Sequence, residues 1–485
     1  MSTTVRPTLR VKPPRPTGIQ KLITSGSRAE RSRHLILTML NPALARRFLH
    51  QLCRGGWLVD ANQSWDDTAG HCALSLGITF AGLQKLELDE RLLDVLRAKA
   101  PAFAQGAWAR ASDQLGDIGA SAPANWEPSF GPASAHLLLI LHANDDTALT
   151  AAQEQLVQLA GDQAFASPWV IHDGLHLAPE PVGRRVHFGM LDGLSQPAIL
   201  PEPPGPVGLP NATRNSHRLG EFVLGYDNDD QANPWRLAAE RPAASRVLAA
   251  EQSRVLADFF KNGSFAAFRK MAQDEAGFRR FVRQQAETLQ GQHTLTQAEA
   301  FIRAKLLGRW DDGRVVQATD TMSGGPSGPD ATADFDFAHD PAGLGCPFGA
   351  HIRRMNPRDD PVVPIRRRPI LRRGMPYGEP YNEKVCKKDD PGRGLLGLFF
   401  CASLEHQFEH LVGQWANDTP MGPNNRGNAR DPLIGHNDPA RHVYDIPLSD
   451  TTALALRGMT PFVTTKGTLY TFFPSLSAIQ QLADR

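Results

Sequence analysis

Three separate segments of the chain contain residues whose types and spacing suit chemistry at one site. The first spans residues 343–358 (GLGCPFGAHIRRMNPR) and places His351 just before Arg353 and Arg354. An imidazole beside guanidinium groups is costly to protonate, so we expect it to stay neutral and able to bind a metal. A neutral histidine next to anion-binding arginines suits a haem, which needs an axial ligand for iron and cations for its propionates. A histidine packed in the core is the alternative interpretation.

The second segment presents an acid on a tight turn. Residues 187–197 (HFGMLDGLSQP) hold Asp192 between Gly189 and Gly193. An Asp-Gly pair is a turn signal that needs no chemistry. The glycines would also let a flat ligand approach the backbone closely, which is the functional interpretation.

The third segment presents a cation. In residues 370–378 (ILRRGMPYG), Arg372 follows a short apolar pair and precedes Gly374. It is either a surface arginine or a fixed positive charge that faces the same pocket as Asp192.

Composition limits the classes of protein that these segments can serve. The 485 residues are 41% hydrophobic and 21% charged, as in ordinary globular proteins, and the length is typical of about three domains. Lys and Arg total 52 against 51 Asp and Glu, which argues against a dedicated nucleic-acid binder. The five cysteines form no C-x-x-C pair, so we expect a reducing compartment and neither a zinc ribbon nor a covalently attached haem.

The N-terminus predicts a tail and not a targeting signal. Residues 1–17 (MSTTVRPTLRVKPPRPT) are basic and rich in proline and lack an apolar stretch, so we expect disorder there. No run of 18 apolar residues occurs in the sequence, and we expect no membrane span and a cytoplasmic protein.

Hydrophobic patterning predicts an α+β architecture. Residues 34–40 and 136–142 are short apolar runs typical of buried strands. Helical periodicity follows each of them, over residues 42–52 and 145–159. Farther along, phenylalanines three and four residues apart predict several helices within residues 235–315.

Together the three segments resemble the dye-decolorising haem peroxidases. FGMLDG fits that family's G-x-x-D-G motif, CPFGAHIRRMNPR fits its proximal-histidine segment, and ILRRGMPYG fits its distal-arginine segment. The segments keep their order from about Ile19 to Trp415. Further matching stretches are 75–84, 220–228, 262–278, 306–313 and 404–418. Gly374 and the helical insertion suit the longer-chain subgroups of the family.

The resemblance implies a fold that patterning alone does not give. It implies two ferredoxin-like domains with antiparallel sheets, one over residues 18–200 and one over residues 201–485. The second would hold the haem and carry the helical insertion at about residues 235–315.

The resemblance also implies roles for individual residues. His351 would be the proximal ligand of a non-covalent haem b, Asp192 the distal acid and Arg372 the distal arginine. The protein would reduce hydrogen peroxide through high-valent iron and oxidise dyes, phenolics or similar organic donors.

Further residues are expected around such a haem. Arg353 and Arg354 would contact the propionates, and Gly193 would lie in the pocket. Phe399 and Phe400 would line it, with core packing as the alternative for both phenylalanines. An acidic partner of His351 would push electron density toward the iron. The candidates are Glu405 and Glu409, one helical turn apart, and we favour Glu405.

Two other functions fit the same fold. A haem carrier or sensor would need His351 and the arginines but not Asp192. A deferrochelatase would release iron from haem. The partners expected for the peroxidase are hydrogen peroxide and an organic electron donor, with no nucleic acid and no membrane.

Overall fold

The structure is a computed structural model that describes residues 15–66, 72–177, 185–202, 215–236, 258–289, 293–317, 319–321, 335–362, 367–384, 392–417 and 428–485. Most of the tail expected over residues 1–17 therefore lies outside the described residues. None of the helices in these ranges is long and apolar enough to cross a bilayer.

The N-terminal half is a ferredoxin-like unit. Its antiparallel strands lie in the order β4-β1-β3-β2, with one helix after β1 and one after β3, which is the βαββαβ arrangement. The elements are β1 (Arg31–Leu37), α2 (Pro42–Arg54), β2 (Ala73–Ile78), β3 (Leu137–Ala143), α7 (Asp146–Ala160) and β4 (Val170–Leu175).

The C-terminal half repeats this arrangement. Its strands lie in the order β13-β7-β10-β8, so the fourth strand is again beside the first and the third beside the second. Short β9 (Met375–Tyr377) also pairs with β10. The elements are β7 (Ser264–Gln273), α9 (Glu275–Glu287), α10 (Leu295–Leu307), β8 (Leu371–Arg372), β10 (Gly394–Cys401), the π-helix η6 (Leu404–Trp415) and β13 (Val463–Phe473). The expected α+β fold with two ferredoxin-like units is confirmed.

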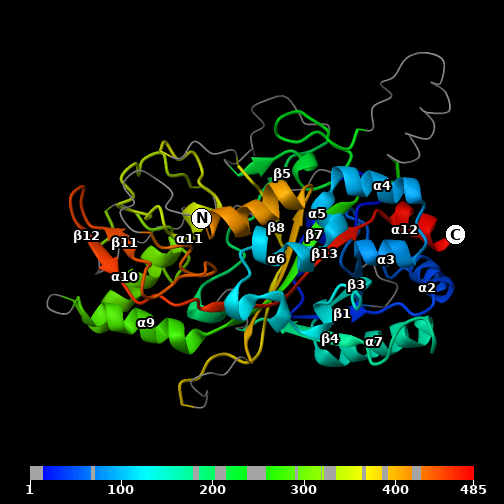
Figure 1. Cartoon of the computed structure of the whole chain (residues 1–485), viewed down its shortest axis with the longest axis horizontal. Coiled ribbons are helices and arrows are strands. Elements are labelled where there is room, and N and C mark those ends of the chain that lie inside the picture. Colours follow the sequence, from blue (N-terminus) through cyan, green and yellow to red (C-terminus); the bar gives the residue numbers. More distant parts are fainter. Residues whose placement is uncertain are drawn as a thin grey trace, which may run out of the picture.

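The two halves share one continuous antiparallel sheet. β13 pairs with β7 along its length and meets β2 at Phe472 and Ile78. Figure 1 shows the result: α9, α10 and the hairpin of β11 (Tyr444–Pro447) and β12 (Ala453–Leu456) lie at one end of the molecule, and α2, α3 and α12 at the other. The last strand of the chain thus joins the halves.

Shorter elements complete the fold. The C-terminal helix α12 packs against α2. The remaining helices and strands with assigned bounds are α1 (Lys21–Thr24), α3 (Phe80–Lys85), α4 (Glu90–Lys99), α5 (Pro101–Gln105), α6 (Ala107–Gln114), β5 (Ala198–Ile199), β6 (Ser216–His217), α11 (His351–Met355) and α12 (Leu476–Ala483).

The expected helical insertion is only partly correct. α9 and α10 are helices, but residues 264–273 form the central strand β7, and residues 237–257 lie outside the described ranges. The three-residue spacing of Phe265, Phe268 and Met271 was misleading because both faces of β7 are buried. A strand covered on both faces carries apolar residues continuously and loses the alternation that marks a half-exposed strand.

A buried ion pair anchors a loop to this central strand. Arg269 on β7 donates to Asp117 with its Nη1 2.8 Å from Oδ2, and both side chains are buried. The Thr465 hydroxyl on β13 also donates to Asp117, at 2.9 Å. These contacts hold residues 117–121 against two strands of the C-terminal half.

Replacement of Asp117 by Asn should therefore destabilise the protein. It leaves the Arg269 guanidinium buried without a carboxylate, which costs about 3–5 kcal/mol in the free energy of unfolding. Urea denaturation followed by circular dichroism measures the loss. Asp113→Asn, on the exposed end of α6, is the matched control. An equal, small effect of both substitutions would show that the pair does not stabilise the fold.

Candidate active site

His351 is oriented by a buried carboxylate. It is the first residue of α11, and its Nδ1 lies 2.9 Å from Oδ2 of Asp431. The imidazole is partly exposed, whereas Asp431 is completely buried. Because Nδ1 is engaged by the carboxylate, Nε2 is the nitrogen left to bind a metal, as in other carboxylate-histidine-metal arrangements.

The protein keeps Asp431 ionised in spite of its burial. Burial would raise the pKa of Asp431. Its contact with His351, the Ile434 amide and the charge of Arg354 outweigh burial and lower the pKa. The amides of Leu433 and Ile434 donate to Oδ1 at 2.9 and 3.0 Å. An anion held this firmly fixes the orientation of the imidazole that it faces.

The expected acidic partners of His351, Glu405 and Glu409, are wrong. Glu405 accepts the amide of Ala102 at 2.5 Å. Glu409 binds Arg110 at 2.6 Å and the hydroxyl of Tyr470 at 2.9 Å. Helix η6 directs both carboxylates toward the N-terminal half and β13 instead of toward α11.

Sequence reasoning missed Asp431 for a clear reason. It lies 80 residues after His351 and beyond Trp415, where the quoted family resemblance ends. Its only local signal is an Asp-Pro pair, which indicates a turn and no chemistry.

Asp192 and Arg372 meet on the distal segments, as expected. Nη1 of Arg372 is 4.0 Å from Oδ1 of Asp192, and about two fifths of each side chain is exposed (41% and 40%). Arg372 is fixed by two further bonds, from Nη2 to the carbonyl of Ser195 at 2.7 Å and from its amide to Oε1 of Gln196 at 3.0 Å. The pair is therefore ordered and still open to a small molecule.

The glycines beside Asp192 leave space next to the turn. Gly189 and Gly193 have φ values of +78° and +74°, and a Cβ built on either would meet no atom within 4 Å. The left-handed backbone favours glycine at both positions. Open space beside Gly193 agrees with its expected place against a flat ligand.

Arginines from two other segments surround the same turn. Arg358, at the end of the segment that carries His351, donates to Oγ of Ser195 at 2.5 Å. Buried Arg309 donates to the carbonyl of Gly313 at 2.7 Å. Burial, followed by the charges of Arg358 and Arg372, lowers the pKa of Arg309 to about 10. The His351 segment, the Asp192 turn and the Arg372 strand thus converge, and the concentrated positive charge suits an anionic ligand.

Arg353 and Arg354 do not have the expected orientation toward such a ligand. Arg353 is buried and binds Asp360 at 2.7 Å, Asp340 at 3.1 Å and the carbonyl of Cys346 at 2.7 Å. Arg354 is completely buried and donates to backbone carbonyls of Trp415 and Ala429 at 2.6 and 2.8 Å. Both point inward from the short helix α11, so they brace loops around His351. Arg309 and Arg358 are therefore better placed than Arg353 and Arg354 to meet an anion beside the Asp192 turn.

Of the two phenylalanines considered for the pocket, Phe400 packs in the core, which is the alternative, and does not line the site. It is completely buried, with its ring edge-on to Phe473 in the core. Its neighbour Phe399 pairs with Arg372 across the β10–β8 ladder and is partly exposed. Because consecutive strand residues point to opposite faces, Phe399 is the residue on the Arg372 side.

A buried histidine anchors the Asp192 turn from behind. His187 has its Nε2 2.9 Å from the carbonyl of Tyr377 and its Nδ1 3.5 Å from Glu275 on α9. The turn also contains Phe188 at a φ of +73°, a conformation that costs energy in a non-glycine residue. Contacts from α9 and β9 therefore hold Asp192 in place.

The donor set fits a haem. One imidazole nitrogen is left for iron, and its ring is fixed by an ionised acid. Open space borders a glycine turn, and arginines that could pair with carboxylates gather near that turn. A haem requires one axial histidine with cations nearby. A metal ion bound only by protein side chains does not have this requirement.

Known proteins with similar sequences include several dye peroxidases. No protein-family model matches the chain. The chain is 28% identical over 419 residues to a dye-decolorizing peroxidase of Exidia glandulosa, covering 84% of this chain and 75% of that protein. It is 28% identical over 469 residues to a multifunctional dye peroxidase of Amycolatopsis sp., covering 92% of this chain and 91% of that one.

Solved structures are similar over nearly the whole chain. An ancestral D-type dye decolorizing peroxidase matches with a TM-score of 0.76 and 24% identity, covering 97% of this chain and 100% of that one. A dye-decolorizing peroxidase solved with 2,6-dimethoxyphenol matches with a TM-score of 0.74 and 22% identity, covering 96% of this chain and 98% of that one. These likenesses show that the fold is shared.

The lowered pKa of Asp431 predicts a pH-dependent contribution to stability. A carboxyl whose pKa is lower in the folded than in the unfolded protein stabilises the fold above about pH 4, and this stabilisation is lost as the pH falls through the folded value. Asp431→Asn should reduce the free energy of unfolding by about 1.5–3 kcal/mol at pH 7 and by less at pH 3. Urea denaturation at the two pH values measures this. Exposed Asp450→Asn is the control, and an equal loss at both pH values would contradict the assignment.

Proposed function

The chain belongs to the dye-decolorising peroxidase family, and on this basis we propose that it reduces hydrogen peroxide at a haem ligated by His351. The observation that carries the proposal is the convergence of three segments on one turn. Arg372 lies 4.0 Å from Asp192, and the same turn is bonded through Arg358 to the segment that carries His351. A haem carrier would not need an acid such as Asp192 held beside a cation such as Arg372.

The chain's own residues would hold the cofactor without a covalent bond. His351 would ligate the iron through Nε2, while Asp431 keeps the ring in one orientation. Arg309 and Arg358 would neutralise carboxylates, and Gly193 would allow close approach. When bound, haem b would supply the iron at which peroxide binds and is reduced.

Asp192 is suited to move a proton. Its carboxylate would accept a proton from one oxygen of hydrogen peroxide and return it to the oxygen that leaves as water. The partial exposure of Asp192 leaves room for peroxide beside it. No other carboxylate lies within ion-pair distance of Arg372 among the residues that the structure describes.

Arg372 is suited to stabilise negative charge. A guanidinium stays charged at every working pH, and its bonds to Ser195 and Gln196 orient it before the reaction begins. Charge that develops on oxygen as the O–O bond breaks would be stabilised by a cation that needs no reorganisation.

The electron donor would be an organic molecule. One similar solved structure contains 2,6-dimethoxyphenol, and the curated relatives carry the name of dye-decolorizing peroxidases. Phenolics and dyes are therefore the donors to test first.

The four described cysteines, Cys53, Cys72, Cys346 and Cys401, are free thiols, which supports the expected cytoplasmic location.

Substitution of the distal pair tests the mechanism. Asp192→Asn and Arg372→Leu should each retain haem but lower the rate of peroxide turnover by about 100-fold or more, since proton transfer and charge stabilisation each contribute that much. Oxidation of 2,6-dimethoxyphenol by stopped flow measures the rate. Asp173→Asn, on the surface of the N-terminal half, is the control. Full activity of both distal variants would exclude the assigned roles.

Substitution of His351 tests the cofactor. The purified, haem-loaded protein should show a Soret band that shifts promptly on addition of one equivalent of peroxide, and His351→Ala should weaken or abolish the band. The absorption spectrum measures both. A Soret band that ignores peroxide would favour the carrier or sensor, and free porphyrin without peroxide would favour a deferrochelatase. No band at all would contradict a haem protein.

A further inference from the structure

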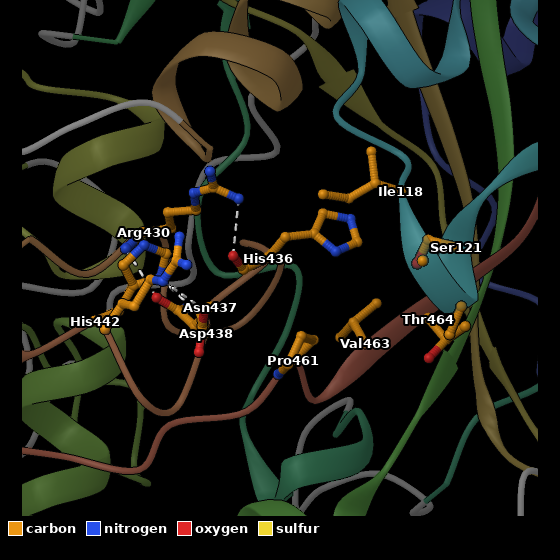
Figure 2. Close-up of a pocket in the computed structure, with 13 residues that line it drawn as sticks. Ile118, Ser121, Arg430, His436, Asn437, Asp438, His442, Pro461, Val463 and Thr464 are labelled. Carbon is orange, nitrogen blue, oxygen red and sulfur yellow. Dashed lines mark hydrogen bonds and ion pairs between the residues drawn. The ribbon is translucent and has the colours of Figure 1, made fainter.

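A second cavity lies next to the loop that carries Asp431. Its volume is about 390 Å³, within the usual range for small-molecule sites. Figure 2 shows Arg430, Asp438 and His442 on one side of it and Ile118, Ser121, Val463 and Thr464 on the other, with His436 between them. The walls come from the loop anchored by Asp117, the loop that follows Asp431 and the start of β13.

One side of the cavity is cationic and rich in hydrogen-bond donors. Arg430 donates to the carbonyl of His436 at 2.8 Å and has no ion pair among the residues that the structure describes. The other arginine, Arg441, is already 3.5 Å from Asp438. Arg430 is therefore the charge that a ligand would meet.

The two histidines add neutral donors. Burial lowers the pKa of His442, and Nδ1 of this ring accepts the amide of Asp438 at 2.9 Å. The proton of the neutral ring is then on Nε2. Burial also lowers the pKa of His436. The rings can donate hydrogen bonds without adding charge to the site.

The opposite side of the cavity is apolar. Ile118 is 49% exposed, which makes it one of only six large hydrophobic side chains exposed in the described part of the chain. Val463 and Pro461 continue this surface. A ligand that covered Ile118 would remove apolar surface from water.

These features select one class of ligand. We propose that the cavity binds a small organic monocarboxylate, whose carboxylate pairs with Arg430 and whose apolar body lies on Ile118 and Val463. Asp438 disfavours a doubly charged anion such as phosphate, because its carboxylate lines the same cavity. The cavity shares no lining residue with the Asp192 and Arg372 site, and the proposal does not depend on the proposed peroxidase function.

Occupancy would act on the loop that holds Asp431. The amide of Arg430 donates to Oδ1 of Asn437 at 2.9 Å, and Nδ2 of Asn437 donates to the carbonyl of Asp431 at 3.0 Å. A ligand bound to Arg430 would thus order the turn that presents Asp431 to His351. We expect slower hydrogen exchange of the amides in residues 430–437 when the ligand is bound.

Calorimetric titration of the haem-loaded, full-length protein tests the proposal, with benzoate as the probe and neutral benzamide beside it. Benzoate should bind once per chain, and benzamide should bind at least tenfold more weakly. Arg430→Gln and Ile118→Glu, on opposite walls, should each weaken benzoate binding at least tenfold. Arg47→Gln, at an exposed position of α2, makes the same change of charge elsewhere and should leave the affinity unchanged.

Three results would overturn the proposal. Benzoate affinity that survives both wall substitutions would place the ligand elsewhere, and affinity lost in Arg372→Leu would place it in the distal pocket. Tighter binding of phosphate than of benzoate would exclude an apolar contribution. The peroxide assay is independent of all three, so the failure of either proposal leaves the other standing.

Discussion

The hydrogen bond between His351 and Asp431 is the interaction on which the candidate site depends. A carboxylate removed from water is costly, and here its cost is offset by two backbone amides and by the imidazole. The backbone around Asp431 is fixed in turn by Arg354, which joins the carbonyls of Trp415 and Ala429. The buried hydrogen bonds of Arg354, on α11, therefore help to hold Asp431 beside His351.

The distal side is built on a different principle. Asp192 and Arg372 remain partly exposed, which leaves room for a small molecule, and their order comes from backbone contacts on several sides. His187 holds the turn from α9 and β9, and Arg358 holds it from the His351 segment. Arg372 itself stands on β8, a two-residue strand at the edge of the sheet. An edge position leaves one side of the strand open for the site.

The same strand order occurs in both halves of the chain, and this explains how segments far apart in the sequence meet. Both halves have the strand order of a ferredoxin-like unit, and β13, the last strand of the chain, lies between β2 and β7. The C-terminal residues thus complete the sheet, and the loop that precedes β11 brings Asp431 to His351. A chain truncated near Trp415 would lack both contributions.

The sequence by itself singled out His351, Asp192 and Arg372 as candidates, because each lies in a short segment whose residues together resemble a family motif. It also determined the α+β class and the strand-helix pairs of the N-terminal half, since local patterning is sufficient there. Only the tertiary structure decided that Asp431, and not Glu405 or Glu409, faces His351. It also decided that Arg353, Arg354 and Phe400 point inward, and that residues 264–273 form a strand. The physical reason is common to these differences: the direction of a side chain and the burial of both faces of a strand depend on contacts far along the chain, which local residue types do not record.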